Sequence, residues 1–370
     1  MRAAVIEQAG QPVRIEDLTL DEPRKGEVLV RMLASGVCHS DLHVRDGDWE
    51  RPGPIVLGHE GAGVVEAVGP GVATTRVGDL VALSWYAPCL ACRHCAEGRQ
   101  WLCTDSPSLR HRMADGTSRL HRDDRSEVLA YLSIGTFAER QVVPATAAIP
   151  MPEGTPPDVA ALIGCCVSTG VGAALKTADL QPGASVVVFG LGGVGLSLVM
   201  GATFAGAARV VVVDRVQAKL DLARELGATH GVLAVDRAGT IEAIREATEG
   251  GPDVAFEAIG LQETIEQAIE VLPPGGTAVL VGLTPFGVRV SFDVFPFVDG
   301  SRRMVGSNYG YAVAAEDFPR YARLHVEGRL PIERLIDRRI ALDDLEDAFD
   351  RMRRGEGLRS VVQFERVEVD

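Results

Sequence analysis

Short apolar or alternating runs dominate the first part of the chain. Turn-forming segments such as 23–26 (Pro-Arg-Lys-Gly) and 69–71 (Gly-Pro-Gly) separate these runs, as is typical of β-strands and their connections. Residues 1–165 are therefore predicted to form a β-rich domain. The strands expected there are residues 3–6, 28–32, 63–68 and 79–83.

From about residue 166 the pattern changes to strands that alternate with helix-period segments. This alternation predicts an α/β domain over residues 166–308, with a doubly wound parallel sheet of six strands covered by helices. The expected strands are Ser185–Phe189, Arg209–Asp214, Gly231–Val235, Asp253–Ala258, Thr277–Gly282 and Arg303–Gly306.

Beyond about residue 309 the chain becomes polar and helical again. Helices are expected over Ala315–Glu327 and Leu342–Gly355, followed by one strand, Ser360–Phe364. This tail is too short to form a domain, so residues 309–370 are expected to pack on the first domain.

Composition and charge exclude some classes of binding partner and bear on the location of the protein. The chain has 37 Lys plus Arg against 51 Asp plus Glu, a net charge of −14, which argues against nucleic acid or an anionic membrane as a partner. Residues 180–208 lack charge, but their glycines and the Gln181-Pro-Gly opening favour a strand, a tight turn and a buried helix over a membrane span. A secretory signal needs a long apolar stretch near the N-terminus, and Glu7 places a charge within that region. A cytoplasmic protein is therefore expected.

A glycine-rich turn joins the first strand of the α/β domain to a helix. Gly190 permits a tight turn, Gly192 and Gly193 leave room for a pyrophosphate, and Gly195 allows close packing of helix and strand. A purely structural turn would show the same glycines. The next strand, however, ends in Asp214, where a carboxylate would meet ribose hydroxyls, and the combination predicts a dinucleotide site.

The acid at the end of that strand also bears on cofactor choice. Asp214 would repel a 2′-phosphate and favours NAD over NADP, although the adjacent Arg215 could offset part of this repulsion. Lys219 lies one helical turn further on and could also reach the ribose, or could be a solvated surface lysine.

Four cysteines fall within residues 86–104 in the pattern Cys89-x₂-Cys92-x₂-Cys95-x₇-Cys103. Four thiolates in one irregular loop suit a tetrahedral zinc with no open position, and such a site would be structural. A redox Cys-x-x-Cys pair is the competing interpretation.

A second possible metal site is dispersed along the chain. Cys38, His59 and Cys165 would leave a fourth zinc position open, as catalysis requires. A buried cysteine is usually only a small apolar residue, and a histidine in a glycine-rich stretch is often structural. Cys166 is interpreted as a packing residue that could exchange roles with Cys165.

These segments together resemble the zinc-containing medium-chain alcohol dehydrogenase family over nearly the whole chain. The resemblance lies in residues 58–63 (Gly-His-Glu-Gly-Ala-Gly), in Cys38 with Ser40 and His43, in residues 162–170 and in the four-cysteine loop. It implies a GroES-like catalytic domain, a Rossmann domain and an active site in the cleft between them. Two zinc ions and NAD are the implied cofactors.

The resemblance also implies roles for single residues. Ser40 and His43 would relay a proton from the substrate to solvent, although His43 could be merely a solvated histidine. Asp41 and Glu60 would orient His59 and adjust the charge at the metal. The remaining matches are Arg359 and His39, which would face the cofactor phosphates, and Trp85, which would line the substrate pocket or belong to the core.

The implied function is reversible, NAD-linked oxidation of a primary or secondary alcohol to an aldehyde or ketone. A thiol-dependent formaldehyde dehydrogenase is the nearest alternative, because residues 113–119 are similar to a stretch in that branch. Pro107 stands where the glutathione enzymes carry an anion-binding arginine, with Arg110 and Arg112 nearby. A non-catalytic zinc and nucleotide-binding protein is an alternative of another class.

A homodimer or homotetramer is expected, in which two chains pair through the sheet strand near Arg303.

Overall fold

The computed structural model describes residues 1–364 of the chain and divides it into two compact units. Unit 1 comprises residues 1–165 and the chain from Val313 onward, and unit 2 comprises Cys166–Ala312. The first junction falls where the sequence pattern changes, and the second lies a few residues beyond the expected residue 309.

Unit 1 is built from two six- to seven-stranded β-sheets, in orders β2-β1-β5-β9-β8-β3 and β11-β7-β6-β4-β19-β18, with β10 also paired to β4. The middle of β4 alternates buried and partly exposed side chains, because one face packs on a core and the other does not, whereas β1 and β10 are buried along most of their length. The strands are β1 Arg2–Ile6, β2 Arg14–Asp17, β3 Thr19–Leu20, β4 Glu27–Gly36, β5 Ile55–Val56, β6 Glu60–Val68, β7 Leu80–Leu83, β8 Leu120–His121, β9 Glu127–Ala130, β10 Arg140–Pro144, β11 Ala148–Pro150, β18 Ile336–Ile340 and β19 Arg359–Gln363.

Few helices accompany these sheets, and most are short. The α-helices of unit 1 are α1 His39–Asp46, α2 Arg93–Ala96, α3 Pro157–Leu162, α10 Ala314–Val326 and α11 Leu345–Arg353. Single 3₁₀ turns cover Gln100–Leu102, Pro107–Arg110, Tyr131–Ser133, Ile332–Leu335 and Leu342–Asp344. The β-rich first domain expected from the sequence is therefore confirmed.

The C-terminal segment completes unit 1, as the sequence predicted. Strand β19 pairs antiparallel with β4, and Val361 lies opposite Gly36. The prediction of a single strand in this segment was wrong, because β18 pairs parallel with β19. Residues 337–339 (Asp-Arg-Arg) make β18 polar, and such a strand is stable at the edge of a sheet but shows no apolar alternation.

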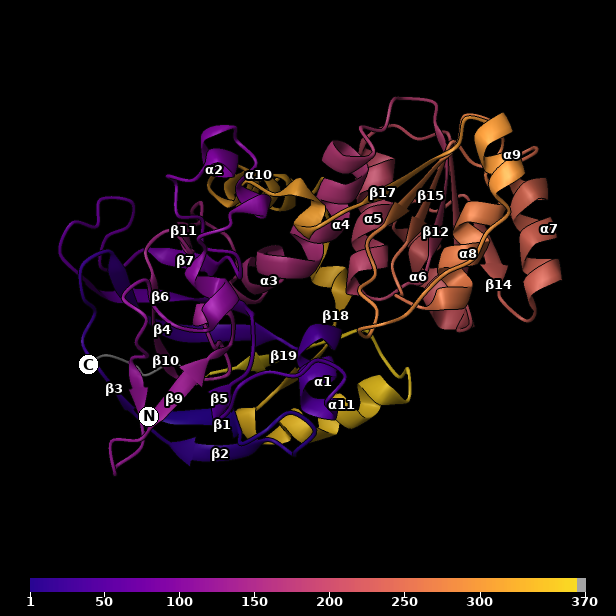
Figure 1. Ribbon diagram of the computed structural model, residues 1–370. Coiled ribbons are helices and arrows are strands. Elements are labelled where there is room, and N and C mark those ends of the chain that lie inside the picture. The colour runs from indigo at the N-terminus through magenta and orange to yellow at the C-terminus, as the bar shows by residue number, and fades with distance from the viewer. Residues whose placement is uncertain (365–370) are drawn as a thin grey trace. The chain divides into compact units, whose positions relative to one another are not determined.

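Unit 2 is a doubly wound α/β domain. Its six strands are all parallel, in the order β14-β13-β12-β15-β16-β17, and Figure 1 shows α5 on one side of the sheet and α7 and α8 on the other. This confirms the predicted Rossmann sheet. The elements are β12 Ser185–Phe189, β13 Arg209–Asp214, β14 His230–Leu233, β15 Val254–Glu257, β16 Thr277–Leu280, β17 Arg303–Gly306, α4 Ser168–Gly172, α5 Gly193–Phe204, α6 Gln217–Glu225, α7 Arg237–Ala247, α8 Gln262–Glu270 and α9 Val294–Asp299, with a π-helical segment at Ala173–Thr177 and a 3₁₀ helix at Tyr309–Tyr311.

Burial on both faces of the sheet explains why the central strands of unit 2 are continuous apolar runs in the sequence. All five residues of β12 are buried, since helices cover both faces of a parallel sheet. The charge-free segment 180–208 forms β12, the turn at Gly190 and the buried helix α5, as expected. A different segment, the helical stretch Pro157–Thr177, is long and apolar enough to cross a membrane, but 89% of its most apolar window is buried inside the protein.

A buried ion pair fixes the long loop of residues 104–135 to the sheet of unit 1. Two guanidinium nitrogens of Arg119 contact the two carboxylate oxygens of Glu27 on β4, and the Arg119 side chain is only 1% exposed. Asp115 lies 2.9 Å from the same guanidinium. Because both Arg119 and Glu27 are shielded from water, Glu27 depends on Arg119 for compensation of its charge, whereas Arg119 also faces Asp115.

We expect Arg119→Ala to lower the free energy of unfolding of unit 1 by about 3–5 kcal/mol, since it leaves Glu27 buried without a counter-charge. Urea titration followed by tryptophan fluorescence measures this loss, because Trp49, Trp85 and Trp101 all belong to unit 1. The control is Arg2→Ala, which removes the exposed pair with Asp343 and should lower the free energy of unfolding far less, because water screens an exposed pair. Equal losses in both variants would contradict the role given to the buried pair.

Candidate metal centres and dinucleotide site

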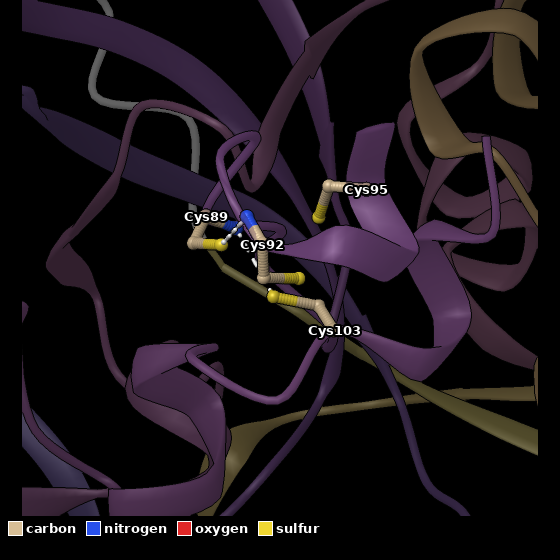
Figure 2. A group of neighbouring side chains, drawn as sticks. All are labelled: Cys89, Cys92, Cys95 and Cys103. Atoms are coloured by element: carbon tan, nitrogen blue, oxygen red, sulfur yellow. Dashed lines mark hydrogen bonds between the residues drawn. The ribbon is translucent and has the colours of Figure 1, made fainter. Parts of the chain in front are cut away.

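Four thiols converge in the loop that carries α2. The sulfurs of Cys89, Cys92, Cys95 and Cys103 all lie within 4.8 Å of one another, and Figure 2 shows them turned toward a common centre. Tetrahedral zinc with bonds of about 2.3 Å separates its sulfur ligands by about 3.8 Å, so the group is suited to one ion. No other described side chain joins this group, as expected of a closed structural site.

Backbone amides prepare these sulfurs for a metal. The amide of Cys89 donates to the sulfur of Cys103, and the amide of Cys92 donates to that of Cys89, as the dashed lines of Figure 2 mark. A hydrogen bond from the backbone of Cys95 lowers the pKa of Cys92 to about 6, whereas burial raises the pKa of Cys95 and of Cys103. Thiolates are the form that binds zinc, and such amides stabilise them. The arrangement favours a metal site over a redox pair.

A second group of possible ligands lies deep in unit 1. One ligand atom from each of Cys38, His59, Glu60 and Cys165 falls within 4.8 Å of the others, and all four residues are buried. The three ligands predicted from the sequence are therefore brought together, although 127 residues separate Cys38 from Cys165 in the chain. Cys166 is buried but does not belong to the group, so the structure places Cys165 and not Cys166 at the centre.

The orientation of His59 is fixed by Asp41. The Nδ1 atom of His59 lies 3.0 Å from an oxygen of Asp41, and that oxygen also accepts the backbone N–H of Gly58. The Nε2 atom of His59 is buried and has no hydrogen-bond partner within residues 1–364. Because a buried nitrogen without a partner is unfavourable, this atom is suited to a metal ion. The expected orienting role of Asp41 agrees with this geometry.

The local fold explains why Asp41 reaches this position. Cys38 is the N-cap of α1, and Asp41 is the third residue of that helix. Its second carboxylate oxygen accepts the backbone N–H of Cys38 at 3.4 Å, the reciprocal half of a capping box. One carboxylate therefore both starts the helix that follows Cys38 and orients His59.

Glu60 occupies a different place from the one expected. It makes no hydrogen bond to His59 among the described residues, and an oxygen of its carboxylate lies 3.3 Å from Arg359. Gly36 lies beneath it, and a Cβ atom there would come within 2.2 Å of the carboxylate. Burial raises the pKa of Glu60 to about 7, although the charge of Arg359 opposes this shift. Glu60 therefore offers an oxygen as the fourth possible ligand atom of this group, and it does not support the imidazole through a hydrogen bond.

Arg359 is buried at the start of β19. It donates to the backbone oxygen of Val37 at 2.7 Å and pairs with Glu60. The contact with a cofactor phosphate, implied by the resemblance, stays a prediction. His39, the other residue expected near the phosphates, is exposed on α1.

The predicted proton relay lies on α1, directly after Cys38. Ser40 is partly buried, and His43 is one turn further along the same helix. The Nδ1 atom of His43 lies 2.8 Å from Asp48, and its ring stacks on Trp49 with centroids 4.7 Å apart. His43 is therefore held in one orientation and is more than a freely solvated histidine.

The glycine turn of unit 2 has the shape required of a dinucleotide site. Gly190 has φ +89°, which favours glycine, and a Cβ atom at Gly195 would lie 1.8 Å from the carbonyl oxygen of Gly190. A Cβ at Gly192 would meet nothing within 4 Å, so the face of the turn at the N-terminus of α5 is open. Free amides at such an end bind phosphate.

Asp214 lies at the end of β13 beside this turn. Its two oxygens accept the backbone N–H groups of Leu191 and Val216, at 2.8 and 3.0 Å. Each oxygen keeps a further lone pair that could accept a ribose hydroxyl. Arg215 is exposed and Lys219 is partly buried on α6, so neither position decides between a ribose contact and a surface role.

Sequence reasoning missed three further residues. Glu257 is buried at the end of β15, where its carboxylate accepts the amides of Ile259 and Gly260, and it shapes the loop next to the glycine turn. Tyr131 lies edge-on to His59, with centroids 5.8 Å apart, and His111 lies 5.5 Å from Tyr131. No local motif marks these residues.

Trp85, expected at the substrate pocket or in the core, is partly buried. It packs against the apolar cluster that includes Val81 and Leu83 of β7, and its ring lies edge-on to Tyr86. The structure therefore supports the core interpretation for at least one face of the indole.

Comparisons with known proteins agree with this geometry. Residues 24–153 match the family described as alcohol dehydrogenase GroES-like domain, and residues 193–327 match that described as zinc-binding dehydrogenase. These matches and the two ligand groups define a zinc-containing dehydrogenase.

Individual relatives cover nearly the whole chain. It is 38% identical to the NDMA-dependent alcohol dehydrogenase of Amycolatopsis methanolica and 35% identical to the S-(hydroxymethyl)glutathione dehydrogenase of Paracoccus denitrificans, with 98% of this chain and 98–99% of the relative covered. A solved zinc-binding-domain alcohol dehydrogenase protein from Burkholderia ambifaria superposes with a TM-score of 0.93 at 37% identity, with 98% of each chain covered. The chain belongs to the zinc-containing medium-chain alcohol dehydrogenase family and is an oxidoreductase.

We expect Asp41→Asn to weaken the binding of one of two zinc ions by about 10- to 100-fold, because the orienting charge beside His59 is lost. Titration with a chromophoric chelator, with zinc counted per chain, measures the effect. The control is Asp46→Asn, which changes an exposed carboxylate on the same helix. If both variants release zinc like the unaltered protein, Asp41 does not support the metal site.

Proposed function

We propose that the chain catalyses the reversible, NAD-linked oxidation of a primary or secondary alcohol to an aldehyde or ketone. The observation that carries this proposal is the buried group of Cys38, His59 and Cys165. Zinc held by these three ligands would have a fourth position that a substrate oxygen could take in place of the nearby Glu60 carboxylate, whereas four cysteines would close the other site.

The bound groups would supply chemistry that side chains lack. Zinc held by Cys38, His59 and Cys165 would lower the pKa of an alcohol hydroxyl, as it lowers that of water from 15.7 to about 7. NAD would supply the acceptor of the electron pair. We assign the glycine turn of unit 2 and Asp214 to the binding of this cofactor, since Asp214 disfavours a 2′-phosphate.

The residues of α1 would move the proton of the alcohol. Ser40 can accept a proton and donate its own, because a hydroxyl is both acceptor and donor. His43, held by Asp48 and Trp49, is the group on the same helix that could pass the proton to solvent. We therefore keep Ser40 and His43 as the relay.

Cys38→Ser should lower turnover by at least about a thousandfold while NADH binding is retained, because Cys38 and the glycine turn belong to different units. NADH appearance at 340 nm with a panel of alcohols, NADH fluorescence and zinc content per chain are the three measurements. The matched control is Cys166→Ser, which changes a neighbouring thiol outside the ligand group. Substantial turnover by a Cys38→Ser protein that has lost this zinc would overturn the assignment.

A thiol-dependent formaldehyde dehydrogenase is the second candidate, favoured by the relative from Paracoccus denitrificans. In that case a cation near residue 107 would bind the thiol cofactor. Arg112 is paired with Glu127, which leaves the exposed Arg110 as the available charge. Assays of formaldehyde with glutathione, with mycothiol and with neither thiol separate the two functions.

We also propose that two copies associate through the β17 edge of unit 2, as the sequence suggested. Strand β17 pairs only with β16 among the described strands, and an exposed strand edge is open to pairing. The chain near it exposes many large apolar side chains, as a contact surface does. These are Leu283, Phe286, Val294, Phe295, Val298 and Met304.

Val298→Glu should convert the assembly to monomers, because it places a charge on this apolar surface. Size-exclusion chromatography with light scattering gives the mass. Val235→Glu is the matched control, since Val235 is at least as exposed but lies beyond the opposite edge strand β14. If unaltered protein has the mass of one chain, the pairing is refuted.

The free thiols of both ligand groups are stable in a reducing compartment, and we propose the cytoplasm as the location of this protein.

A further inference from the structure

The segment that follows α1 turns back onto the helix. Gly47 ends the helix with φ +87°, in the left-handed region that favours glycine, and its amide donates to a carbonyl oxygen of the last turn. A Cβ atom at Gly47 would lie 3.4 Å from the Cα atom of Gly10, so the neighbouring loop leaves little space there. After this turn, the next two residues, Asp48 and Trp49, both contact His43 in the last turn of α1.

Three contacts from this segment fix the imidazole of His43. Its Nδ1 atom lies 2.8 Å from Oδ2 of Asp48, and its ring stacks on the indole of Trp49 with 28° between the ring planes. The amide of Trp49 also donates to the carbonyl oxygen of His43 at 3.2 Å. Trp49 is itself buried in the apolar cluster that includes Leu345 and Phe349 of α11. The stacking surface is therefore immobile, and His43 has one favoured orientation.

The contact with Asp48 also selects the tautomer of His43. An aspartate is ionised at neutral pH, and an ionised carboxylate only accepts hydrogen bonds. Nδ1 of His43 is therefore the donor in the 2.8 Å contact. A neutral imidazole carries a single proton, so Nε2 keeps its lone pair and is the nitrogen that can accept a proton.

The pair of His43 and Asp48 reaches the surface. The side chain of His43 is 22% exposed and that of Asp48 is 44% exposed, so the carboxylate borders solvent. The other charged side chains at the end of α1 have partners of their own, because Arg45 pairs with Glu346 on α11 and Asp46 pairs with Arg353. Within residues 1–364, Asp48 is the carboxylate that pairs with His43.

We propose that Asp48 is a positioning residue of the proton relay. It holds His43 in the tautomer whose Nε2 can accept the proton released at Ser40, and its charge stabilises the imidazolium that results. Solvent then removes one proton, and the neutral ring returns to its starting tautomer. An exposed ion pair contributes little to stability, so the effect of Asp48 falls on proton transfer and not on the fold. The inference rests on the proposed function, which assigns Ser40 and His43 to the relay.

Asp48→Asn tests this role because it keeps the size of the side chain and removes its charge. The measured quantity is the single-turnover rate of NADH formation from an alcohol, which product release does not limit. We expect Asp48→Asn to lower this rate about tenfold, a part of the 10²- to 10⁴-fold contributed by a well-placed base. Glu50→Gln, which changes an exposed carboxylate of the same segment, should keep the rate. An unchanged rate in Asp48→Asn overturns the proposal.

A buffer dependence separates a role in the relay from a general loss of structure. The concentration of HEPES is raised at constant pH and ionic strength. We expect the rate of Asp48→Asn to rise with HEPES, since an external base takes over the proton, and the rate of the unaltered enzyme to stay constant. A lowered rate in Asp48→Asn that HEPES does not restore refutes the role in the relay.

A measurement without substrate distinguishes failure of this inference from failure of the proposed function. Nitrogen NMR of labelled histidine rings in the zinc-loaded protein, with His43→Gln to assign the signals, reports which nitrogen carries the proton. We expect Nδ1 of His43 to carry it in the unaltered protein and in Glu50→Gln, and the Nε2–H form to appear in Asp48→Asn. This result with no oxidation of any alcohol would refute the proposed function, while the hold of Asp48 on His43 stands. An unchanged tautomer in Asp48→Asn refutes the inference.

Discussion

The pairing of β4 with β6 at their ends is the constraint on which the buried ligand group depends. Gly36, at the end of β4, lies opposite Glu60, at the start of β6. Cys38 follows the first strand by two residues and His59 directly precedes the second, so this register alone brings a thiol and an imidazole together. Gly36 has no side chain, and only for that reason can the Glu60 carboxylate lie over this position of β4.

Around this register, buried polar groups pair with one another, although both carboxylate oxygens of Glu60 lack a hydrogen-bond partner within residues 1–364. Asp41 holds His59, Glu60 faces Arg359, and Arg359 reaches the backbone of Val37. Each of these groups would be unfavourable alone in an apolar interior, and together they are compatible with burial. The remaining buried nitrogen of His59 lies near the thiols of Cys38 and Cys165, and a metal ion bound there would complete the network.

Local sequence patterns predicted the helices and strands better than they predicted the contacts between these elements. The parallel strands of unit 2 could be placed because most are short apolar runs, of which β12 and β13 are rich in valine, and the glycine turn because close packing excludes every other residue at Gly195. The four-cysteine loop is likewise local. Strand β18 was missed because an edge strand needs no apolar alternation, and its partner β19 is distant in sequence.

The residues of the site also divide into those that a local sequence pattern predicts and those that only long-range contacts bring together. Cys38, His59 and Cys165 could be grouped only through the family resemblance, since spacing alone left a structural histidine and packed cysteines possible. The position of Glu60 as a possible donor depends on strand register and on Arg359, which no sequence pattern expresses. Tyr131 and His111 approach the centre through a loop with unusual backbone angles, and propensities carry no information about such a loop.

The place of β19 in unit 1 has a consequence for biosynthesis. This strand lies between β4 and β18 and brings Arg359 to Glu60, yet the ribosome makes it after all of unit 2. Synthesis proceeds at about 5–20 residues per second, and domains generally fold as their residues emerge. Unit 2 can therefore be complete while the first-made half of unit 1 still has an open strand edge. The order of translation leaves that half exposed to chaperones or to misassembly for the longest time.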